Sequence, residues 1–261
     1  MVKIDVITYL HQDEKFLQNC FKGLKDQDIS FNWHLLCYQR PVFNFETLNP
    51  IIHLLPAPIC NKAQAYNFIL PQLNAPFIAF NDADDCSLKN RFSAQINYLN
   101  KNENIDILGG GLIINSKYQG WKVKLNNQEI LNELIFNNPM VNSSIMIRNR
   151  PDFWGKVVKY NNTLNRAEDY DFWFSCAKNN LIFANLEIPL IDYKKNNAIK
   201  CDEEKINARE VRRLALNWRL NITVNDQYFK LFNAYSEKKY LFFWQKNRLK
   251  AFLKNSRLVI D

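Results

Sequence analysis

Long hydrophobic runs are absent from this sequence of 261 residues. The longest apolar stretches comprise only a handful of residues, whereas a helix that crosses a bilayer needs about 20. From Met1 the chain enters a strand-like pattern directly and places an acid, Asp5, where a signal peptide is apolar. We therefore expect no membrane-spanning segment, no export signal and a cytoplasmic location.

Paired cysteines, internal repeats and low-complexity segments are also absent. The cysteines are scattered without a Cys-x-x-Cys pair, which argues against a zinc site and against a disulfide framework. They are Cys20, Cys37, Cys60, Cys86, Cys176 and Cys201. With 47% hydrophobic and 23% charged residues, the chain is typical of one large or two small soluble globular domains with reduced thiols.

The net charge of +8 is unevenly distributed. From Lys194 to Asp261 there are 16 Lys and Arg against 7 Asp and Glu, while the preceding residues carry 18 against 19. This asymmetry indicates an anionic surface as a partner of the C-terminal part.

Strand and helix patterns alternate through the first hundred residues. Strand patterns occupy residues 3–9, 33–38, 51–55 and 77–80, and helical patterns occupy 13–25, 62–70 and about 88–100. This alternation predicts a parallel α/β sheet with right-handed crossovers. The pattern changes after residue 108, where three glycines lead into 112–115 and a segment around Trp121. A helix over about 128–136, a strand over 144–148 and a helix over 169–178 follow, and beyond Asp192 the sequence is helical and basic.

An acidic cluster, Asn81-Asp82-Ala83-Asp84-Asp85, comes directly after the apolar run that ends at Phe80. Ligands of open α/β sheets bind at the carboxyl ends of strands. Two carboxylates one residue apart can share a hard divalent cation, which often bridges to phosphate. The alternative is an acidic turn in which Asp84, Asp85 or Ser87 caps the next helix.

A second acidic pair, Glu168-Asp169, opens the helix pattern over 169–178. Acids in a first helical turn commonly stabilise the helix through its dipole. The alternative is that one carboxylate faces the first acidic cluster and removes a proton from an attacking hydroxyl. The residues of this segment alone do not decide between the two.

Taken together, these segments resemble a family 2 glycosyltransferase of the GT-A fold. The matching segments occur in the order and spacing of that family across about three-quarters of the chain. They are Glu14-Lys15-Phe16-Leu17, Ala65-Tyr66-Asn67, Asn81-Asp82-Ala83-Asp84-Asp85, Arg91 with Gln95, Ile105-Asp106-Ile107-Leu108-Gly109-Gly110, Asn138-Pro139-Met140-Val141-Asn142-Ser143-Ser144-Ile145-Met146, Glu168-Asp169-Tyr170-Asp171-Phe172-Trp173 and Tyr193. The resemblance implies an α/β fold, namely a Rossmann-like GT-A mixed sheet flanked by helices. It implies a catalytic domain over residues 1–200, with a nucleotide-binding half to about 110 and an acceptor half after it. A basic helical extension follows over 201–261.

The resemblance also implies roles for individual residues. Asp84 would bind Mn²⁺ or Mg²⁺, and Asp82 would share the metal or contact the ribose of the donor. Asp169 would be the general base, and Glu168 would orient the acceptor or the base. The other implied donor contacts are Thr8, Tyr9, Gln39, Lys62 and Asn67, and the implied acceptor-side residues are Asn138, Met140 and Asn142.

Three departures from the family pattern stand out. The second strand ends in Cys37-Tyr38-Gln39-Arg40-Pro41 without the usual acid for the nucleotide base, so Gln39 is the candidate for that contact. Tyr66 occupies the place of an arginine, and Lys62, one turn earlier, is a candidate for restoring the charge. Asn142 occupies the place of a histidine, and the absence of a Gln-x-x-Arg-Trp motif argues against a processive membrane synthase.

The C-terminal extension combines an apolar stripe with many cations. Ala208, Val211, Ala215 and Trp218 share one helical face, and the run Tyr240-Leu241-Phe242-Phe243-Trp244 is surrounded by lysines. One interpretation is docking on the anionic inner face of the plasma membrane. The other is that the aromatics pack on the catalytic domain while the charges are solvated. Nucleic acid is not expected as a partner, because no recognition fold accompanies the patch.

The expected function is that of an inverting glycosyltransferase, a hexosyltransferase that moves one sugar from a nucleotide-diphosphate donor to a saccharide or lipid-linked acceptor. UDP-hexose and UDP-N-acetylhexosamine are the expected donors, in bacterial surface glycan synthesis such as that of lipopolysaccharide or capsule. Two alternatives stay open. One is a metal-dependent phosphatase using Asp82 and Asp84, and the other is a non-catalytic membrane-adaptor or nucleic-acid-binding protein that uses the basic tail.

Overall fold

A central sheet of eight strands organises the computed structural model, which describes residues 3–11, 14–45, 48–56, 58–59, 61–117, 123–150, 152–194, 201–237 and 243–255. The strand order is β3-β2-β1-β4-β7-β6-β8-β5. The strands are β1 (Ile4–Leu10), β2 (Asn32–Cys37), β3 (Ile51–Leu54), β4 (Phe77–Phe80), β5 (Cys86–Ser87), β6 (Ile107–Ile114), β7 (Met146–Arg148) and β8 (Phe183–Tyr193). The sheet is mixed, because β7 runs antiparallel to both β4 and β6, and β5 runs antiparallel to β8.

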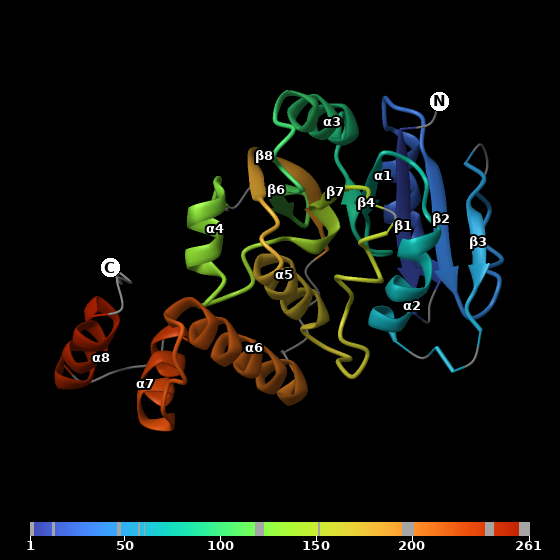
Figure 1. The fold of residues 1–261 in the computed structure, drawn as a ribbon. Helices are drawn as coiled ribbons and strands as arrows, with labels where there is room; N and C mark the ends of the chain where they lie inside the picture. The colour runs from blue at the N-terminus through green and yellow to red at the C-terminus, as the bar shows by residue number, and fades with distance from the viewer. Residues whose placement is uncertain are drawn as a thin grey trace.

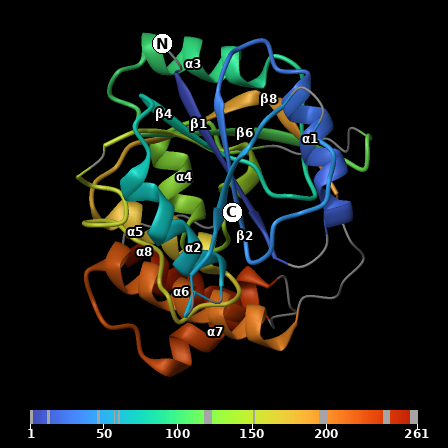
Figure 2. The ribbon, with the colours of Figure 1, turned by 90° about the vertical axis from the view of Figure 1, so that its right-hand side faces the viewer.

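Helices cover both faces of this sheet (Figures 1 and 2). The α-helices are α1 (Leu17–Lys25), α2 (Lys62–Ile69), α3 (Arg91–Lys101), α4 (Asn127–Glu133), α5 (Glu168–Lys178), α6 (Asp202–Leu220), α7 (Asp226–Ser236) and α8 (Phe243–Asn255). The 3-10 helices are η1 (Glu14–Phe16), η2 (Leu70–Gln72) and η3 (Asn142–Ser144). One apolar cluster joins α1 and α3 to one face of the sheet, and a larger cluster joins the remaining α-helices to the other.

The expected alternation of strands and helices over the first hundred residues is confirmed. β4 occupies the predicted residues because its continuous apolar run is buried on both faces, as in the parallel sheets of α/β proteins. α2 ends before Pro71, which lacks the N–H that a longer helix would need and instead sits in η2.

Three strands of the described residues, β5, β6 and β8, lie outside the predicted strand patterns. β8 contains Pro189, and a proline inside an apolar run argues against a strand. Pro189 is accommodated because the pairing of β6 with β8 shifts register at Gly111, which pairs with it. The glycines of β6 permit close contact with β8: a Cβ on Gly110 would lie 2.5 Å from Leu190 Cδ1. β5 comprises only two residues, too short for a periodic pattern.

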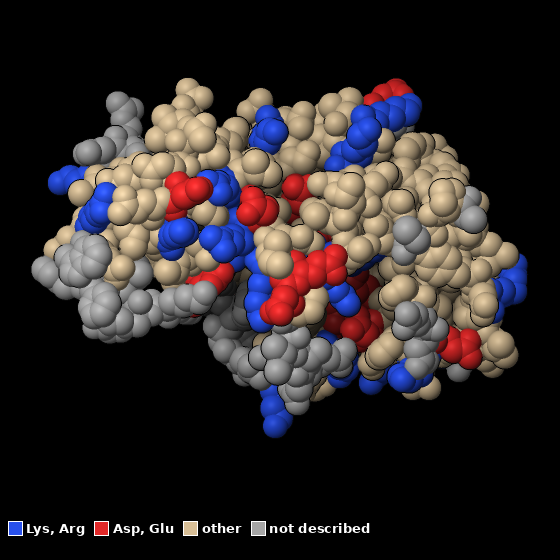
Figure 3. Space-filling view, turned by 90° about the horizontal axis from the view of Figure 1, so that it is seen from below, with Lys and Arg blue, Asp and Glu red and all other residues tan. Residues whose placement is uncertain are grey.

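The C-terminal helices pack on the larger apolar cluster. Val211 of α6, Phe229 and Phe232 of α7, and Leu249 and Leu253 of α8 are all buried in it. On the face of the molecule that carries these helices, acidic side chains gather around a hollow and basic side chains lie beside them (Figure 3). No helix in the described ranges is both long and apolar enough to span a bilayer. The predicted segment around Trp121 and the tail residues 238–242 lie outside the described residues.

Candidate active site

The acidic cluster lies where β4 ends, as the sequence predicts. Asn81, the first residue after the strand, is fully buried, and its side-chain oxygen accepts hydrogen bonds from Ser87 (2.6 Å) and Arg91 (3.2 Å). The buried Arg91 also donates to the carbonyls of Phe80 and Ile145, at 2.9 and 3.1 Å. Arg91 therefore ties the end of β4 to the segment that precedes β7 and fixes the position of the acidic cluster.

Asp82 is surrounded by hydrogen-bond donors. It accepts hydrogen bonds from Lys62 Nζ at 2.6 Å, Ser143 Oγ at 2.9 Å and Asn142 Nδ2 at 3.1 Å. Burial alone would raise the pKa of Asp82, but the charge of Lys62 and these hydrogen bonds lower it below its ordinary value. Asp82 is therefore ionised at neutral pH.

The next two acids of the cluster, Asp84 and Asp85, have pKa values that are raised instead of lowered. Burial and the charge of Asp82 raise the pKa of Asp84 above its ordinary value. The same two effects raise the pKa of the buried Asp85 to about 7, although Ser143 and the backbone N–H of Lys194 donate to it. Ser143 contacts both Asp82 and Asp85, and its single hydrogen can be donated to only one of them at a time. The cluster thus carries an excess of negative charge around Asp84.

This charge and the all-oxygen donor set fit a hard divalent cation. Mg²⁺ and related ions prefer carboxylate oxygens and complete their coordination with water and substrate phosphates. Among the described residues no group of three or more His, Cys, Asp or Glu side chains could enclose a metal alone. A cation held here by Asp84 and Asp82 would need its remaining ligands from outside the described side chains, such as water or phosphate oxygens.

A second pair of carboxylates opens α5. Ala167, immediately before them, adopts a left-handed backbone conformation (φ 58°), which costs a non-glycine residue about 1 kcal/mol. Asp169 accepts hydrogen bonds from Asn138 Nδ2 at 2.9 Å and from the Tyr170 backbone N–H at 2.8 Å. Burial raises the pKa of Asp169, although Lys62 opposes this effect. Burial likewise raises the pKa of Glu168 to about 7, although Lys62 Nζ lies 3.9 Å from its Oε1.

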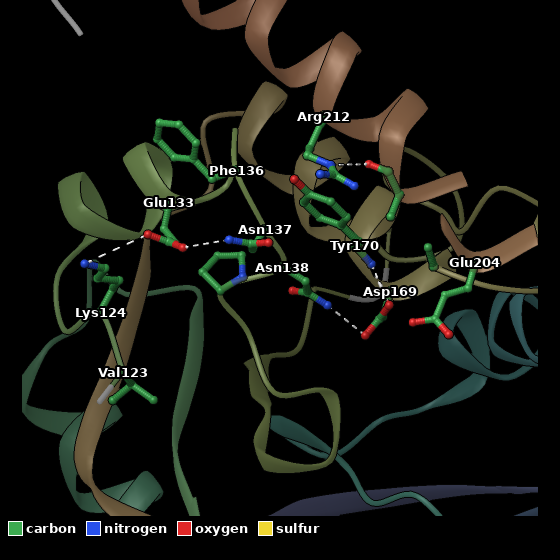
Figure 4. Close-up of a pocket in the computed structure, with 13 residues that line it drawn as sticks. Val123, Lys124, Glu133, Phe136, Asn137, Asn138, Asp169, Tyr170, Glu204 and Arg212 are labelled. Carbon is green, nitrogen blue, oxygen red and sulfur yellow. Dashed lines mark hydrogen bonds and ion pairs between the residues drawn. The ribbon is translucent and has the colours of Figure 1, made fainter. Parts of the chain in front are cut away.

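Glu168 and Asp169 line two different pockets. Glu168 faces a cavity of about 660 Å³ together with Lys62, Asp82 and Asp84. This cavity, which we call the β4 pocket, is also lined by Tyr9, Leu10, His11, Phe16, Asn61, Ala83, Asp85, Asn165, Arg166, Tyr193 and Glu203. Asp169 faces a cavity of about 500 Å³ between α4, α5 and α6, shown in Figure 4. We call this second cavity the α6 pocket.

The structure brings most of the predicted site residues together. Tyr9, Lys62, Asp82, Asp84 and Glu168 line the β4 pocket, and Asn138 and Asp169 line the α6 pocket. Asn142 is also close to this group, because its Nδ2 donates a hydrogen bond to Asp82 at 3.1 Å.

Five predicted residues, the Asn142 just described among them, are outside the linings of these two described pockets. Thr8 is buried and accepts a hydrogen bond from Trp33 Nε1 at 3.1 Å, whereas Gln39 is exposed. Asn67 donates to the carbonyl of Tyr160 at 2.8 Å, and Met140 is buried next to Asn185.

Several lining residues were missed by sequence reasoning. Asp85 belongs to the acidic cluster that follows β4, but the resemblance assigns it no role. Glu204, Ala208 and Arg212 come from α6, which follows the family-like segments. No motif marks them, and only their spacing of four residues places them on one helix face.

Comparison with known proteins identifies the family. The family model described as "Glycosyl transferase family 2" matches residues 5–156, more than half of the chain. The chain therefore belongs to glycosyl transferase family 2.

Two curated relatives are themselves uncharacterized glycosyltransferases. One, from Methanocaldococcus jannaschii, is 31% identical over 129 residues, which cover 45% of this chain and 41% of the relative. The other, from Haemophilus influenzae, is 26% identical over 171 residues, which cover 59% and 52% of the two chains. The matched part of the chain thus spans about half the length of these relatives.

Solved structures confirm the GT-A-type mixed α/β fold. S. aureus TarS, crystallised as residues 1–349 with UDP-GlcNAc, superposes with a TM-score of 0.65 at 18% identity, covering 90% of this chain and 71% of that one. A mannosyltransferase from Pyrobaculum calidifontis in complex with GDP-Man and Mn²⁺ has a TM-score of 0.54 at 9% identity, covering 98% and 70%. At these identities the similarity establishes the fold alone.

Proposed function

We propose that this glycosyltransferase transfers a single hexose or N-acetylhexosamine from a UDP-linked donor, with inversion, to a saccharide or lipid-linked acceptor of a bacterial surface glycan. The observation that carries the proposal is the placement of Glu168 and Asp169 on two pockets, one of which also contains Asp82 and Asp84. A donor diphosphate beside Asp84 and an acceptor hydroxyl beside Asp169 would meet at the start of α5. The UDP-GlcNAc complex of TarS supports the choice of donor.

In the proposed reaction each residue has a separate task. Asp169, held by Asn138, takes the proton of the acceptor hydroxyl, whose oxygen attacks the anomeric carbon of the donor sugar. The bond from that carbon to the diphosphate breaks, and the electron pair leaves with the diphosphate oxygen. Lys62 places a positive charge between Asp82 and Glu168, near the departing group. Asp84 and Asp82 would hold Mn²⁺ or Mg²⁺, which supplies Lewis-acid stabilisation of the leaving diphosphate when bound.

A donor screen tests this function. UDP-hexoses and UDP-N-acetylhexosamines should raise the melting temperature of the protein in the presence of Mn²⁺, and EDTA should abolish this effect. A ligand that binds only the folded state stabilises that state, by about 2.7 kcal/mol when its concentration is 100 times its Kd. Release of UDP on addition of a saccharide acceptor should follow. GDP-sugars and free UMP serve as comparisons. If no nucleotide sugar stabilises the protein and phosphomonoesters are hydrolysed instead, the phosphatase alternative replaces this proposal.

We also propose that the C-terminal helices hold the enzyme at an anionic membrane surface through charge. The large apolar side chains described in α7 and α8 pack on the core, so they are not available for insertion into a bilayer. Lys246, Lys250 and Lys254 of α8 are exposed and spaced by four residues, which places them on one face. Cations near an anionic leaflet contribute about 1 kcal/mol each.

Vesicle co-sedimentation tests this attachment. Binding to anionic vesicles should disappear at 1 M salt, where the Debye length is about 3 Å. Replacing Lys246, Lys250 and Lys254 together by Gln should also remove it. The control replaces Lys89, Lys101 and Lys156, exposed lysines elsewhere on the surface, by Gln. These variants are preferable to truncation before Asp226, which would remove Phe229 and Phe232 from the core. Equal sedimentation of both triple variants would refute docking through α8.

A further inference from the structure

One wall of the α6 pocket is formed by α6, which lies well beyond the segment matched by the family model. Glu204, Ala208 and Arg212 recur every fourth residue on α6 and therefore lie on one face of the helix. Arg212 is 6% exposed, and it is held by the Ala208 carbonyl at 3.2 Å and by Glu237 Oε1 at 3.3 Å. This wall is therefore fixed in place.

The opposite wall comes from the end of α4 and the chain around it. Phe136 lines the pocket, and its ring stacks on Phe232 of α7 with 5.0 Å between centroids. Glu133 accepts a hydrogen bond from Asn137 Nδ2 at 3.3 Å, and Lys124 Nζ lies 3.9 Å from its other oxygen. Figure 4 shows these side chains across the pocket from Glu204 and Arg212. An immobilised aromatic ring with amide and carboxylate groups offers an apolar surface and hydrogen-bond partners together, which suits a sugar ring and its hydroxyls.

The charges of the lining narrow the class of ligand. Glu133, Asp169 and Glu204 contribute three carboxylates, and Lys124 and Arg212 contribute two cations. Each cation already lies within 4 Å of a carboxylate, that of Glu133 or Glu237. A phosphate or a uronic acid would bring further negative charge into a lining that already has an excess of it. The volume of about 500 Å³ lies within the range of small-molecule sites, roughly 300–1,000 Å³.

We propose that the α6 pocket binds the terminal sugar of an uncharged saccharide acceptor, and that Glu204 and Ala208 determine which acceptor fits. This inference rests on the proposed glycosyl transfer, because Asp169 at the pocket wall is the base that the acceptor hydroxyl must reach. Glu204 accepts hydrogen bonds from sugar hydroxyls, and the small Ala208 side chain leaves room for the ring. The C-terminal helix α6 is thus part of the acceptor site.

Two variants with matched controls test the assignment. Ala208→Met narrows the pocket, and Leu214→Met changes an exposed residue of the same helix. Glu204→Gln removes a charge from the pocket, and Glu210→Gln removes one from an exposed position of α6. The two pocket variants should raise KM for an uncharged saccharide acceptor about tenfold or more, while the KM for the nucleotide sugar stays within about twofold. Both controls should match the wild type, and melting temperatures report on folding.

The outcomes separate this inference from the proposed function. If no nucleotide sugar is bound or consumed by the wild type, the glycosyl-transfer proposal itself fails. If sugar is transferred but both pocket variants match their controls in acceptor KM, the acceptor does not occupy the α6 pocket. If acceptors ending in a uronic acid or a phosphorylated sugar have a lower KM than uncharged ones of equal length, the assignment to uncharged saccharides is wrong. If Ala208→Met proves unstable, Glu204→Gln still decides, because it preserves the side-chain shape.

Discussion

Asp84→Ala is expected to reduce sugar transfer by about 10²–10³-fold or more, the cost of removing electrostatic stabilisation from a developing charge. In the proposed mechanism, a cation that neutralises the leaving diphosphate would lose a protein ligand without this carboxylate. The fold should be unaffected. The pKa of Asp84 is raised in the folded protein, so its negative charge lowers stability at neutral pH and its removal relieves that cost. Transfer rates and melting temperatures of the two proteins are the measurements.

Asp152→Ala is the matched control, because Asp152 is an exposed acid far along the chain from the acidic cluster. It should retain normal transfer. Full activity of Asp84→Ala, or wild-type activity that persists in EDTA, would contradict the metal-dependent mechanism. A fall in melting temperature of several degrees would instead indicate that Asp84 has a structural role.

Asp169→Asn is expected to lower kcat by about 10²–10⁴-fold, the usual contribution of a positioned general base. The amide cannot accept the proton of the acceptor hydroxyl, whereas donor binding in the neighbouring pocket should persist. The Tyr170 N–H requires an acceptor at Oδ1, so the new amide nitrogen would face Asn138 Nδ2, which is also a donor. A stability loss of about 1 kcal/mol is therefore expected as well. Single-turnover rates and donor titrations separate these effects.

The pH dependence of the wild type provides a second readout for the same base. A raised pKa keeps Asp169 protonated, and hence inactive, at low pH, so kcat/KM should rise with pH until the carboxyl is ionised. Glu168 directly precedes Asp169 and has a pKa raised to about 7, so its ionisation also contributes to the pH profile. Glu168→Gln should therefore change the shape of the profile while retaining most of the maximal rate. If Glu168→Gln loses activity and Asp169→Asn does not, their roles are reversed.

The part of this site that follows β4 could be predicted from sequence because it depends on local chemistry. A buried apolar run followed by carboxylates has few structural interpretations, and its position at a strand end follows from the alternation of strands and helices. The contact of Ser143 with Asp82, by contrast, depends on the register of β7 against β4, which no local pattern specifies. β8 was missed because tertiary packing overrides the local preference of Pro189. The wall formed by α6 was missed because its residues are ordinary in an amphipathic helix.

The hydrogen bonds that join the acidic cluster to later parts of the chain have a consequence for the order in which the protein folds. Ser143 lies 61 residues after Asp82, its hydrogen-bond partner, and Lys194 lies 109 residues after Asp85. Contacts between residues so distant in sequence require large loops to close, which makes them slow to form. The first strands and helices can associate through nearer neighbours, but the acidic cluster acquires its hydrogen bonds only when these later segments arrive. The ability to bind a donor should therefore emerge at the end of folding, after most of the sheet is already in place.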